Sequence, residues 1–449
     1  MATRKSGRRE ARSKTANGAP RLGMVMRFQP KAAPAGIKQL EAGGFQVASS
    51  RDFHSAEAVP NDFGGAEVQY FERFGIAIVR RDAERLAPVV QKAMEQKVVR
   101  SARPERTYRA LGMPAVPFRH AHGPDRGPAR ALDGAYLRGY RDGIAELVDR
   151  VLDGEGAAEA AAAAVRFDES SVTWGLQAIR ADLSPFSGAG IKVAVLDTGF
   201  DHTHPDFRGR MVTKKTFVTR SSDDDLVGHG THCVGTACGP QRPASVPRYG
   251  VAYEAEIFAG KVLGDDGFGT DRSIIAGMEW ALDQGCEVIS MSLGAVTRIG
   301  DQPNDDYEHI GQVCLDAGTL VVAAAGNESD RPRHIAPIGS PANASTILAV
   351  AAVDRALETA WFSCGGLNPG QLVDLAAPGV DVLSCVPGGG YDRNNGTSMA
   401  TPHVAGVAAL IAESDARYRG WQLWTRVVQL VRPLRAPSRD VGKGLTQAP

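Results

Sequence analysis

Short apolar runs alternate with amphipathic stretches from about residue 170 onward. Stretches such as 273–285 (SIIAGMEWALDQG) have helical spacing of apolar residues. Between such stretches lie nearly continuous apolar runs that predict buried strands, at 191–199, 255–263, 287–294 and 319–327. Because this alternation is typical of a parallel sheet with helices on both faces, we predict one α/β domain over residues 170–449.

Residues 22–111 carry a different pattern, that of a small α+β module. Strand patterns occur at 22–29 and within 66–80, and a helix with one apolar face follows. That face consists of Leu86, Val89, Val90, Ala93 and Met94. The segment 97–111 then closes a βαβ-like unit.

The remaining segments are predicted to carry little packed structure. Residues 1–21 form a basic stretch that predicts a disordered arm, with a nucleic-acid tail or a targeting peptide as the alternatives. Residues 112–169 begin with many Pro, Gly and charged residues and predict a linker that contains a helix. The arm lacks the apolar segment of a secretory signal, so we expect synthesis in the cytoplasm, with secretion by a non-classical route left open.

Composition gives no sign of nucleic acid or membrane partners. The 449 residues suggest two or three structural units. Lys plus Arg and Asp plus Glu both number 51, so global charge does not favour nucleic acid or membrane partners. No apolar run approaches the roughly 18 residues that a membrane span needs. The six cysteines lack the paired spacing of a zinc site, and most of them are predicted to be buried thiols.

Polar residues follow the ends of the predicted strands. Asp197 ends the first run, Ser292 lies near the end of the third, and Asn327 ends the fourth. In parallel sheets the working site lies beyond the carboxyl ends of the strands. A carboxylate at the end of a wholly apolar strand is costly unless it is paired, so Asp197 is predicted to have a role.

Two further segments supply histidine and serine. His229 and His232, in GHGTH, could be half of a metal site, a proton-transfer base with a neighbour, or core residues. Ser398 lies where a loop meets a long apolar helix. An acid, a histidine and a serine are the minimum set that activates a hydroxyl nucleophile, and the side-chain amide of Asn327 could stabilise an oxyanion.

The motifs that carry these residues resemble the signature blocks of the subtilisin family of serine proteases. They are DTGFDHTHPDF, GHGTHCVGTACG, MSLG, AAAGN and NGTSMATPHVAGVAAL. The resemblance covers about residue 170 to the end and implies a subtilisin-like three-layer α/β sandwich. It also implies that Asp197, His229 and Ser398 are the catalytic triad and Asn327 the oxyanion amide. His232 is then a helix-packing residue, and the metal interpretation falls away.

The resemblance also implies the residues that hold the substrate. One edge segment would pair with the substrate backbone as an added strand, and a second segment would form the opposite wall. A glycine would form the floor of the main specificity pocket and leave room for a large apolar side chain. These residues are Gly267, Phe268 and Gly269 (edge), Ser292, Leu293 and Gly294 (wall), and Gly339 (floor).

One calcium site of the family is predicted to be absent or weak in this chain. Asp206 matches a calcium ligand of many subtilisins, but the asparagine expected in the partner loop is missing, and one carboxylate does not make a calcium site. We therefore predict that this particular calcium site is absent or weak, assign no metal ligand and no cofactor, and leave other ion sites open. The two histidines of DHTH and the run 223–225 are interpreted as solvated loop residues.

Residues 22–111 resemble the family's inhibitory propeptide, a small α+β (ferredoxin-like) domain whose C-terminal tail lies in the active-site cleft. The chain is therefore expected to be a monomeric, self-processing zymogen of a serine endopeptidase with broad or apolar-leaning specificity, cut between about Leu111 and Ser170. Its partners would be protein or peptide substrates and its own propeptide. An acyl transferase or peptide cyclase on the same scaffold, and a non-catalytic binding protein, are the alternatives.

Overall fold

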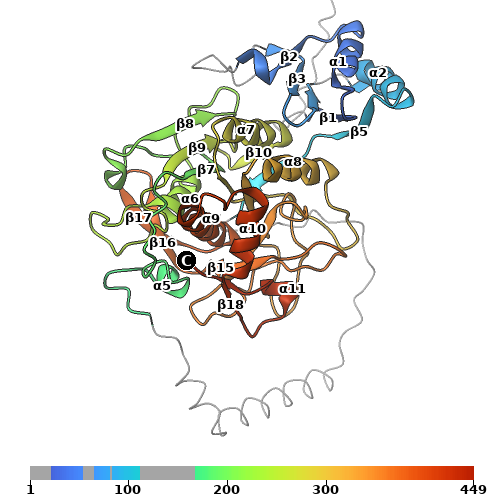
Figure 1. Cartoon of the computed structure of the whole chain (residues 1–449). Helices are drawn as coiled ribbons and strands as arrows, with labels where there is room; N and C mark the ends of the chain where they lie inside the picture. Colours follow the sequence, from blue (N-terminus) through green and yellow to red (C-terminus); the bar gives the residue numbers. More distant parts are fainter. Residues whose placement is uncertain (1–21, 54–64, 81–82, 112–166) are drawn as a thin grey trace, which may run out of the picture.

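The computed structural model of the protein describes residues 22–53, 65–80, 83–111 and 167–449. The predicted arm at 1–21 and nearly all of the predicted linker, including its helix, lie outside the described residues. In the described part the chain forms a small N-terminal unit packed against a larger α/β domain (Figure 1).

A nine-stranded sheet forms the centre of the larger domain, in the order β18-β19-β15-β14-β13-β11-β7-β9-β8. Every neighbouring pair is parallel except β18 with β19. The strands are β7 (Lys192–Asp197), β8 (Val212–Thr216), β9 (Glu256–Lys261), β11 (Val288–Met291), β13 (Leu320–Ala324), β14 (Leu348–Val353), β15 (Leu375–Pro378), β18 (Val431–Arg432) and β19 (Leu445–Thr446). The predicted parallel α/β architecture is confirmed, and the four predicted runs contain β7, β9, β11 and β13.

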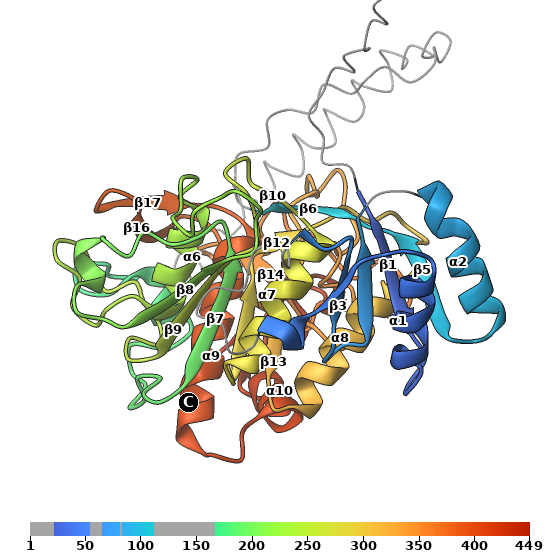
Figure 2. The ribbon, with the colours of Figure 1, turned by 90° about the horizontal axis from the view of Figure 1, so that it is seen from above.

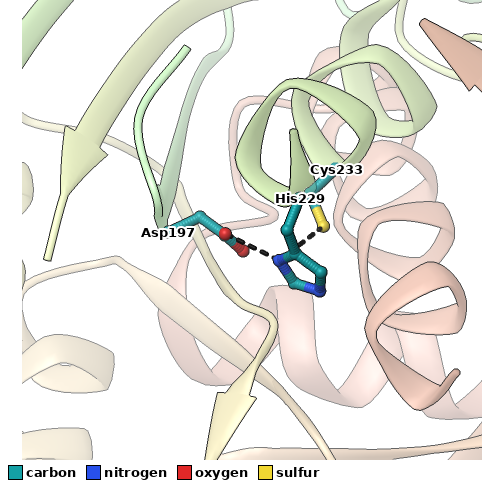
Figure 3. A group of neighbouring side chains, drawn as sticks. All are labelled: Asp197, His229 and Cys233. Carbon is teal, nitrogen blue, oxygen red and sulfur yellow. Dashed lines mark hydrogen bonds and ion pairs between the residues drawn. The ribbon is translucent and has the colours of Figure 1, made fainter. Parts of the chain in front are cut away.

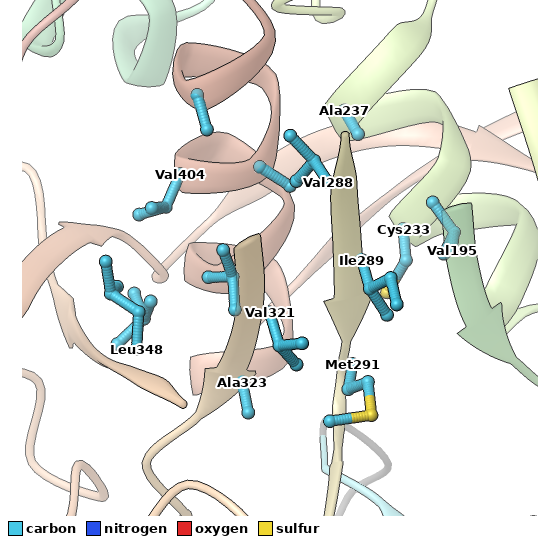
Figure 4. Close-up of a cluster of buried hydrophobic side chains, with 14 of the residues drawn as sticks. Val195, Cys233, Ala237, Val288, Ile289, Met291, Val321, Ala323, Leu348 and Val404 are labelled. Carbon is cyan, nitrogen blue, oxygen red and sulfur yellow. The ribbon is translucent and has the colours of Figure 1, made fainter. Parts of the chain in front are cut away.

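Helices cover the sheet and complete the three layers. The helices α6 and α9 pack against each other and onto the central strands, and their apolar side chains meet those of the strands (Figure 4). The helices of this domain are α5 (Trp174–Ala178), α6 (His229–Cys238), α7 (Asp271–Asp283), α8 (Asp305–Asp316), α9 (Thr397–Ser414), α10 (Gly420–Gln429) and α11 (Ser438–Val441). Of these, α9 is buried along almost its whole length because it runs through the domain's core.

The N-terminal unit has its own five-stranded sheet, in the order β2-β3-β4-β1-β5. Its elements are β1 (Met24–Phe28), α1 (Ala33–Ala42), β2 (Val47–Ser49), β3 (Val68–Phe71), β4 (Ile76–Val79), α2 (Ala83–Glu95) and β5 (Val99–Pro104). The predicted α+β character agrees with these elements. The sequence pattern missed α1 and β2, and the single strand pattern within 66–80 is a hairpin of β3 and β4.

The end of the N-terminal unit leaves its own sheet. The strand β6 (Thr107–Ala110) lies between two short strands of the larger domain, β10 (Phe268–Thr270) and β12 (Leu293–Gly294), and pairs with both in antiparallel fashion. Figure 2 shows β6 crossing toward these strands from the N-terminal sheet. The predicted closing strand at 97–111 is therefore two strands, β5 and β6, that serve different sheets.

Two further findings concern the cysteines and the length of the helices. The six cysteines are all buried free thiols, where burial was predicted for most of them. Within the described ranges, none of the helices combines the length and the apolar character that crossing a bilayer requires.

Candidate active site

Asp197 and His229 meet at the carboxyl end of β7. Asp197 is the last residue of β7, and His229 is the first residue of α6. The Nδ1 atom of His229 donates to Oδ1 of Asp197 at 2.7 Å, and both side chains are buried (Figure 3). This bond fixes the orientation of the imidazole and leaves Nε2, which has no hydrogen-bond partner among the described residues, as the free ring nitrogen.

Asp225 anchors the start of the helix that carries His229. It is 3% exposed; its Oδ1 accepts from Gly228 N at 2.8 Å, and its Oδ2 accepts from Thr231 N at 2.7 Å and Thr231 Oγ1 at 2.8 Å. A carboxylate at a helix N-terminus also stabilises the helix dipole. The interpretation of Asp225 as a solvated loop residue was wrong, and so was that of His204, which is buried and bonds to the carbonyl of Gly390.

Thr198 links the strand and the helix of this pair. Its Oγ1 donates to Asp225 Oδ1 at 2.9 Å and accepts from Gly230 N at 2.8 Å. Gly230 leaves no room for a side chain, since an added Cβ would lie 2.2 Å from the carbonyl oxygen of Gly199. Sequence reasoning missed the positioning roles of Thr198 and Asp225. A usable signal was their place in the chain, since Thr198 directly follows Asp197 and Asp225 lies four residues before His229.

Ser398 lies in the first turn of α9 and is completely buried in this form of the chain. Its Oγ donates to the carbonyl oxygen of Ser292 at 3.1 Å. The thiol of Cys233 lies 3.9 Å from Nδ1 of His229 and 3.6 Å from the carbonyl oxygen of Ser398, so serine and histidine pack against the same sulfur. The Ser398 backbone and the imidazole therefore contact the same thiol, while the Ser398 hydroxyl is turned toward Ser292.

Asn327 follows β13 and contacts the residue before Ser398. Its Oδ1 accepts from the backbone N–H of Thr397 at 2.9 Å and from the Thr397 hydroxyl at 2.8 Å. These bonds hold the carbonyl side of the amide against the start of α9. The NH₂ side therefore faces away from Thr397 and is half-buried with its residue.

The predicted edge and wall segments flank β6. On one side Gly269 lies opposite Tyr108, and the Gly267 carbonyl accepts from Ala110 N at 3.0 Å. On the other side Leu293 lies opposite Ala110. The residue after β6, Leu111, donates its N–H to the Ser292 carbonyl at 3.2 Å. The extended segment 107–111 is thus flanked by six of the seven residues that were predicted to bind substrate. They are Gly267, Phe268 and Gly269 on one side, and Ser292, Leu293 and Gly294 on the other.

Glycines leave space next to the side chain of Leu111. A Cβ at Gly294 would lie 2.8 Å from Cδ1 of Leu111, so that side chain rests on the glycine. Gly339, which was predicted to form the pocket floor, lies beside Ala295, the residue after Gly294. Its neighbour Ser340 exchanges backbone hydrogen bonds with Ala295, and a Cβ at Gly339 would lie 3.0 Å from the Ala295 oxygen. Its role in a pocket stays a prediction.

The other histidine of GHGTH has a packing role in the structure. His232 is buried, and its Nε2 bonds to the carbonyl of Val382 at 3.0 Å. Burial, with a further contribution from His229, lowers the pKa of His232 to about 4. Among the described residues, the potential metal-ligand group is Asp197, His229 and Cys233, which does not include His232.

The oxygens of Asp206 are engaged by donors of the protein. Oδ1 accepts from Ala244 N at 2.8 Å, and Oδ2 accepts from the hydroxyls of Tyr249 at 2.7 Å and Tyr391 at 3.0 Å. The carboxylate that matches a calcium ligand in related proteases thus accepts hydrogen bonds from two tyrosine hydroxyls of this chain. This arrangement gives a physical reason for the expectation that this calcium site is absent or weak, which stays a prediction.

Comparison with known proteins identifies the family. The profile described as the Subtilase family matches residues 188–436, more than half of the chain. An intracellular serine protease of Paenibacillus polymyxa is 37% identical over 268 residues, which is 58% of this chain and 79% of that protein. Subtilisin BL of Lederbergia lenta is 38% identical over 282 residues (62% and 97%), and subtilisin E of Bacillus subtilis is 37% identical over 280 residues (61% and 70%).

The fold and the site define an α/β protein with a serine and a buried acid–histidine pair at the carboxyl edge of its sheet. The profile match places the chain in the subtilase family. It is a serine endopeptidase of the subtilisin type, and proteins or peptides are its substrates. This result agrees with the resemblance drawn from the sequence motifs.

Proposed function

We propose that the chain is the zymogen of an endopeptidase in which Ser398 is the nucleophile, His229 the general base and Asp197 the group that orients it. The observation that carries the proposal is the bond of 2.7 Å between His229 and Asp197 at the carboxyl end of β7, with the helix of His229 packed against the helix whose first turn contains Ser398. The side-chain amide of Asn327 and the backbone N–H of Ser398 are the two oxyanion donors.

The reaction follows from these positions. The Ser398 hydroxyl turns from the Ser292 carbonyl toward Nε2 of His229, which takes its proton as Oγ attacks the substrate carbonyl carbon. The carbonyl oxygen gains the negative charge, and the two donors stabilise it. The C–N bond then breaks, and the imidazolium gives its proton to the departing amine. Water repeats the sequence on the acyl-enzyme, releasing the acid product and restoring Ser398.

The pH profile tests the role of His229. Burial lowers the pKa of His229, but the charge and hydrogen bond of Asp197, with a further contribution from Cys233, outweigh this and raise the pKa well above 6.5. A general base must be neutral, so activity is lost as pH falls through the raised pKa. We expect kcat/KM of the processed enzyme to rise with pH through a midpoint above about 6.5. A midpoint below 6 would contradict this role.

We infer that residues 22–111 form the inhibitory cover of the zymogen. Arg103 bridges two carboxylates in the first turns of α7 and α8, at 2.7 Å from Asp271 and 2.7 Å from Asp306. A further contact joins His309 of α8 to the carbonyl of Phe74. Since the tether keeps the cover at an effective concentration on the order of millimolar, even modest affinity keeps the cleft filled.

The register of β6 supports one particular cut. Leu111 is the residue whose N–H binds the Ser292 carbonyl, the same oxygen that accepts from Ser398 Oγ. The carbonyl of Leu111 follows directly in the chain, so we propose that Ser398 cuts the bond between Leu111 and Gly112. The side chain of Leu111 on Gly294 supports an apolar preference at this position.

Mass spectrometry of the purified chain tests this cut. We expect the wild type to yield a fragment that begins at Gly112, whereas Leu111→Asp should lose that cut because a charge would be buried against Gly294. The matched control is Leu183→Asp at a leucine that is 67% exposed, which should process normally. A wild-type fragment with a different N-terminus, unaffected by Leu111→Asp, would disprove the proposed site.

A further inference from the structure

A buried acid lies beside β6, two residues beyond the predicted edge segment. Asp271, the first residue of α7, has 0% exposure. Its carboxylate accepts from the Tyr108 hydroxyl at 3.0 Å, from Arg103 at 2.7 and 3.2 Å, and from the backbone N–H of Arg106 at 2.6 Å. Throughout the described ranges, each recorded hydrogen bond to this carboxylate comes from residues 103–108, so all of these donors belong to the N-terminal unit.

The side chain of Tyr108 fills the space next to Asp271. It is 1% exposed and lies three residues before Leu111 on β6. The ring of Tyr307 meets it edge to face, with 5.8 Å between ring centroids. Burial and the charge of Asp271 raise the pKa of Tyr108, so its hydroxyl stays protonated and donates.

Departure of the N-terminal unit removes these donors from Asp271 at once. Water can then reach the carboxylate, but a substrate in the place of β6 buries it again, and a buried carboxylate without donors is unfavourable. Hydrogen bonds to charged groups are among the stronger ones in proteins. A substrate that occupies the place of β6 can restore one bond if it carries a hydroxyl where Tyr108 lies. A phenylalanine there would fill the same volume but leave the carboxylate without that donor.

We propose that Asp271 is a specificity-determining residue that selects substrates with tyrosine three residues before the one whose carbonyl is attacked. The substrate class is thus peptides of the form Tyr-X-X-Leu, cut after the leucine. This inference rests on the proposed function, because it takes β6 as the guide to how a substrate lies. Selection by a bond to a hydroxyl is sharp, since the analogue without the hydroxyl leaves a polar group unpaired.

The aromatic surroundings favour tyrosine over a basic residue at this position. The face that Tyr108 covers includes the ring of Tyr307, whose edge-to-face contact suits another aromatic ring. Arg103, the cation that also binds Asp271, reaches the carboxylate from β5, outside the segment that pairs with β10 and β12. A lysine in the place of Tyr108 would have to bury its ammonium group beside Tyr307.

The test compares two quenched fluorogenic peptides, one containing TYRALG and the other TFRALG, on the self-processed enzyme made from the full chain. The wild type should have a kcat/KM on the order of tenfold or more higher for the tyrosine peptide, the range of a hydrogen bond to a charged group. In Asp271→Ala the ratio should fall to about 1–2, and in Asp271→Asn, which keeps a neutral acceptor, to an intermediate value. Because each ratio is taken within one enzyme, a general loss of activity cancels.

Asp316→Asn is the matched control, since it removes an exposed carboxylate at the far end of α8 and should keep the wild-type ratio. Equal rates for the two peptides on the wild type would overturn the inference without any variant. So would a preference that survives in Asp271→Ala, or a TKRALG peptide that is cut faster than TYRALG. If no peptide is cut and a fluorophosphonate does not label Ser398, the proposed function itself fails.

Discussion

Ser398→Ala is expected to abolish peptide hydrolysis and to leave the chain at full length. The substitution removes the nucleophile and one hydrogen bond, that to the Ser292 carbonyl, but little packing volume. In subtilisin itself, loss of the nucleophile lowers kcat by about 10⁶, and a loss of that order is expected here. The measurements are kcat/KM on a peptide ester and the mass of the purified chain after prolonged incubation.

The exposed Ser222 provides the matched control for this variant. Ser222→Ala should keep activity, self-processing and labelling by a fluorophosphonate, all of which Ser398→Ala should lose. The melting temperature of Ser398→Ala should stay close to that of unprocessed wild type, since one lost hydrogen bond costs about 1 kcal/mol. Trimming of Ser398→Ala at the same place and rate in purified form would rule out self-processing.

Asn327→Ala should lower kcat far more than it changes KM. The amide is proposed to donate only when the carbonyl oxygen of the substrate becomes negative, so its loss raises the transition state and not the bound ground state. Loss of the corresponding amide in subtilisin costs about 10²–10³ in kcat, and the same order is expected in this relative. Steady-state kinetics on the processed enzyme measure both constants.

A structural effect of Asn327→Ala can be separated from the catalytic one. The side chain also accepts two hydrogen bonds from Thr397 at the start of α9, so the variant should lose about 1 kcal/mol of stability. Asn395→Ala is the control, because Asn395 also accepts a backbone hydrogen bond, from Asp381, but has no place in the proposed mechanism. An equal change in kcat and KM for Asn327→Ala would argue against an oxyanion role.

The sheet and the positions at its edge could be predicted from sequence because they depend on local patterns. A short, nearly continuous apolar run becomes a buried strand where helices cover both faces of the sheet, and β7, β9, β11 and β13 follow that rule. The carboxyl ends of parallel strands share one edge of the sheet. The sequence therefore predicted that Asp197 and Asn327 lie at the same edge of the sheet. His229 and Ser398 were assigned to the site from the sequence motifs that contain them.

The partners of particular polar groups could not be predicted in this way. Asp225 was interpreted as solvated because it stands in a run of acids, yet donors from Thr198, Gly228 and Thr231 surround it once β7 and α6 come together. The tyrosine hydroxyls that engage Asp206 come from residues 43 and 185 positions away in the chain. A pattern of apolar and polar residues carries no information about such distant donors.

The sequence by itself thus determined the parallel α/β domain, the family and the residues proposed for catalysis, since each depends on short contiguous segments. Only the tertiary structure decided the path of β6. Residues 97–111 have one continuous strand-like pattern, but β5 pairs with β1, whereas β6 pairs with β10 and β12 of the other unit. A strand pairs with whichever unpaired strand edges lie beside it in the folded chain, and the sequence of the strand does not specify which strands these are.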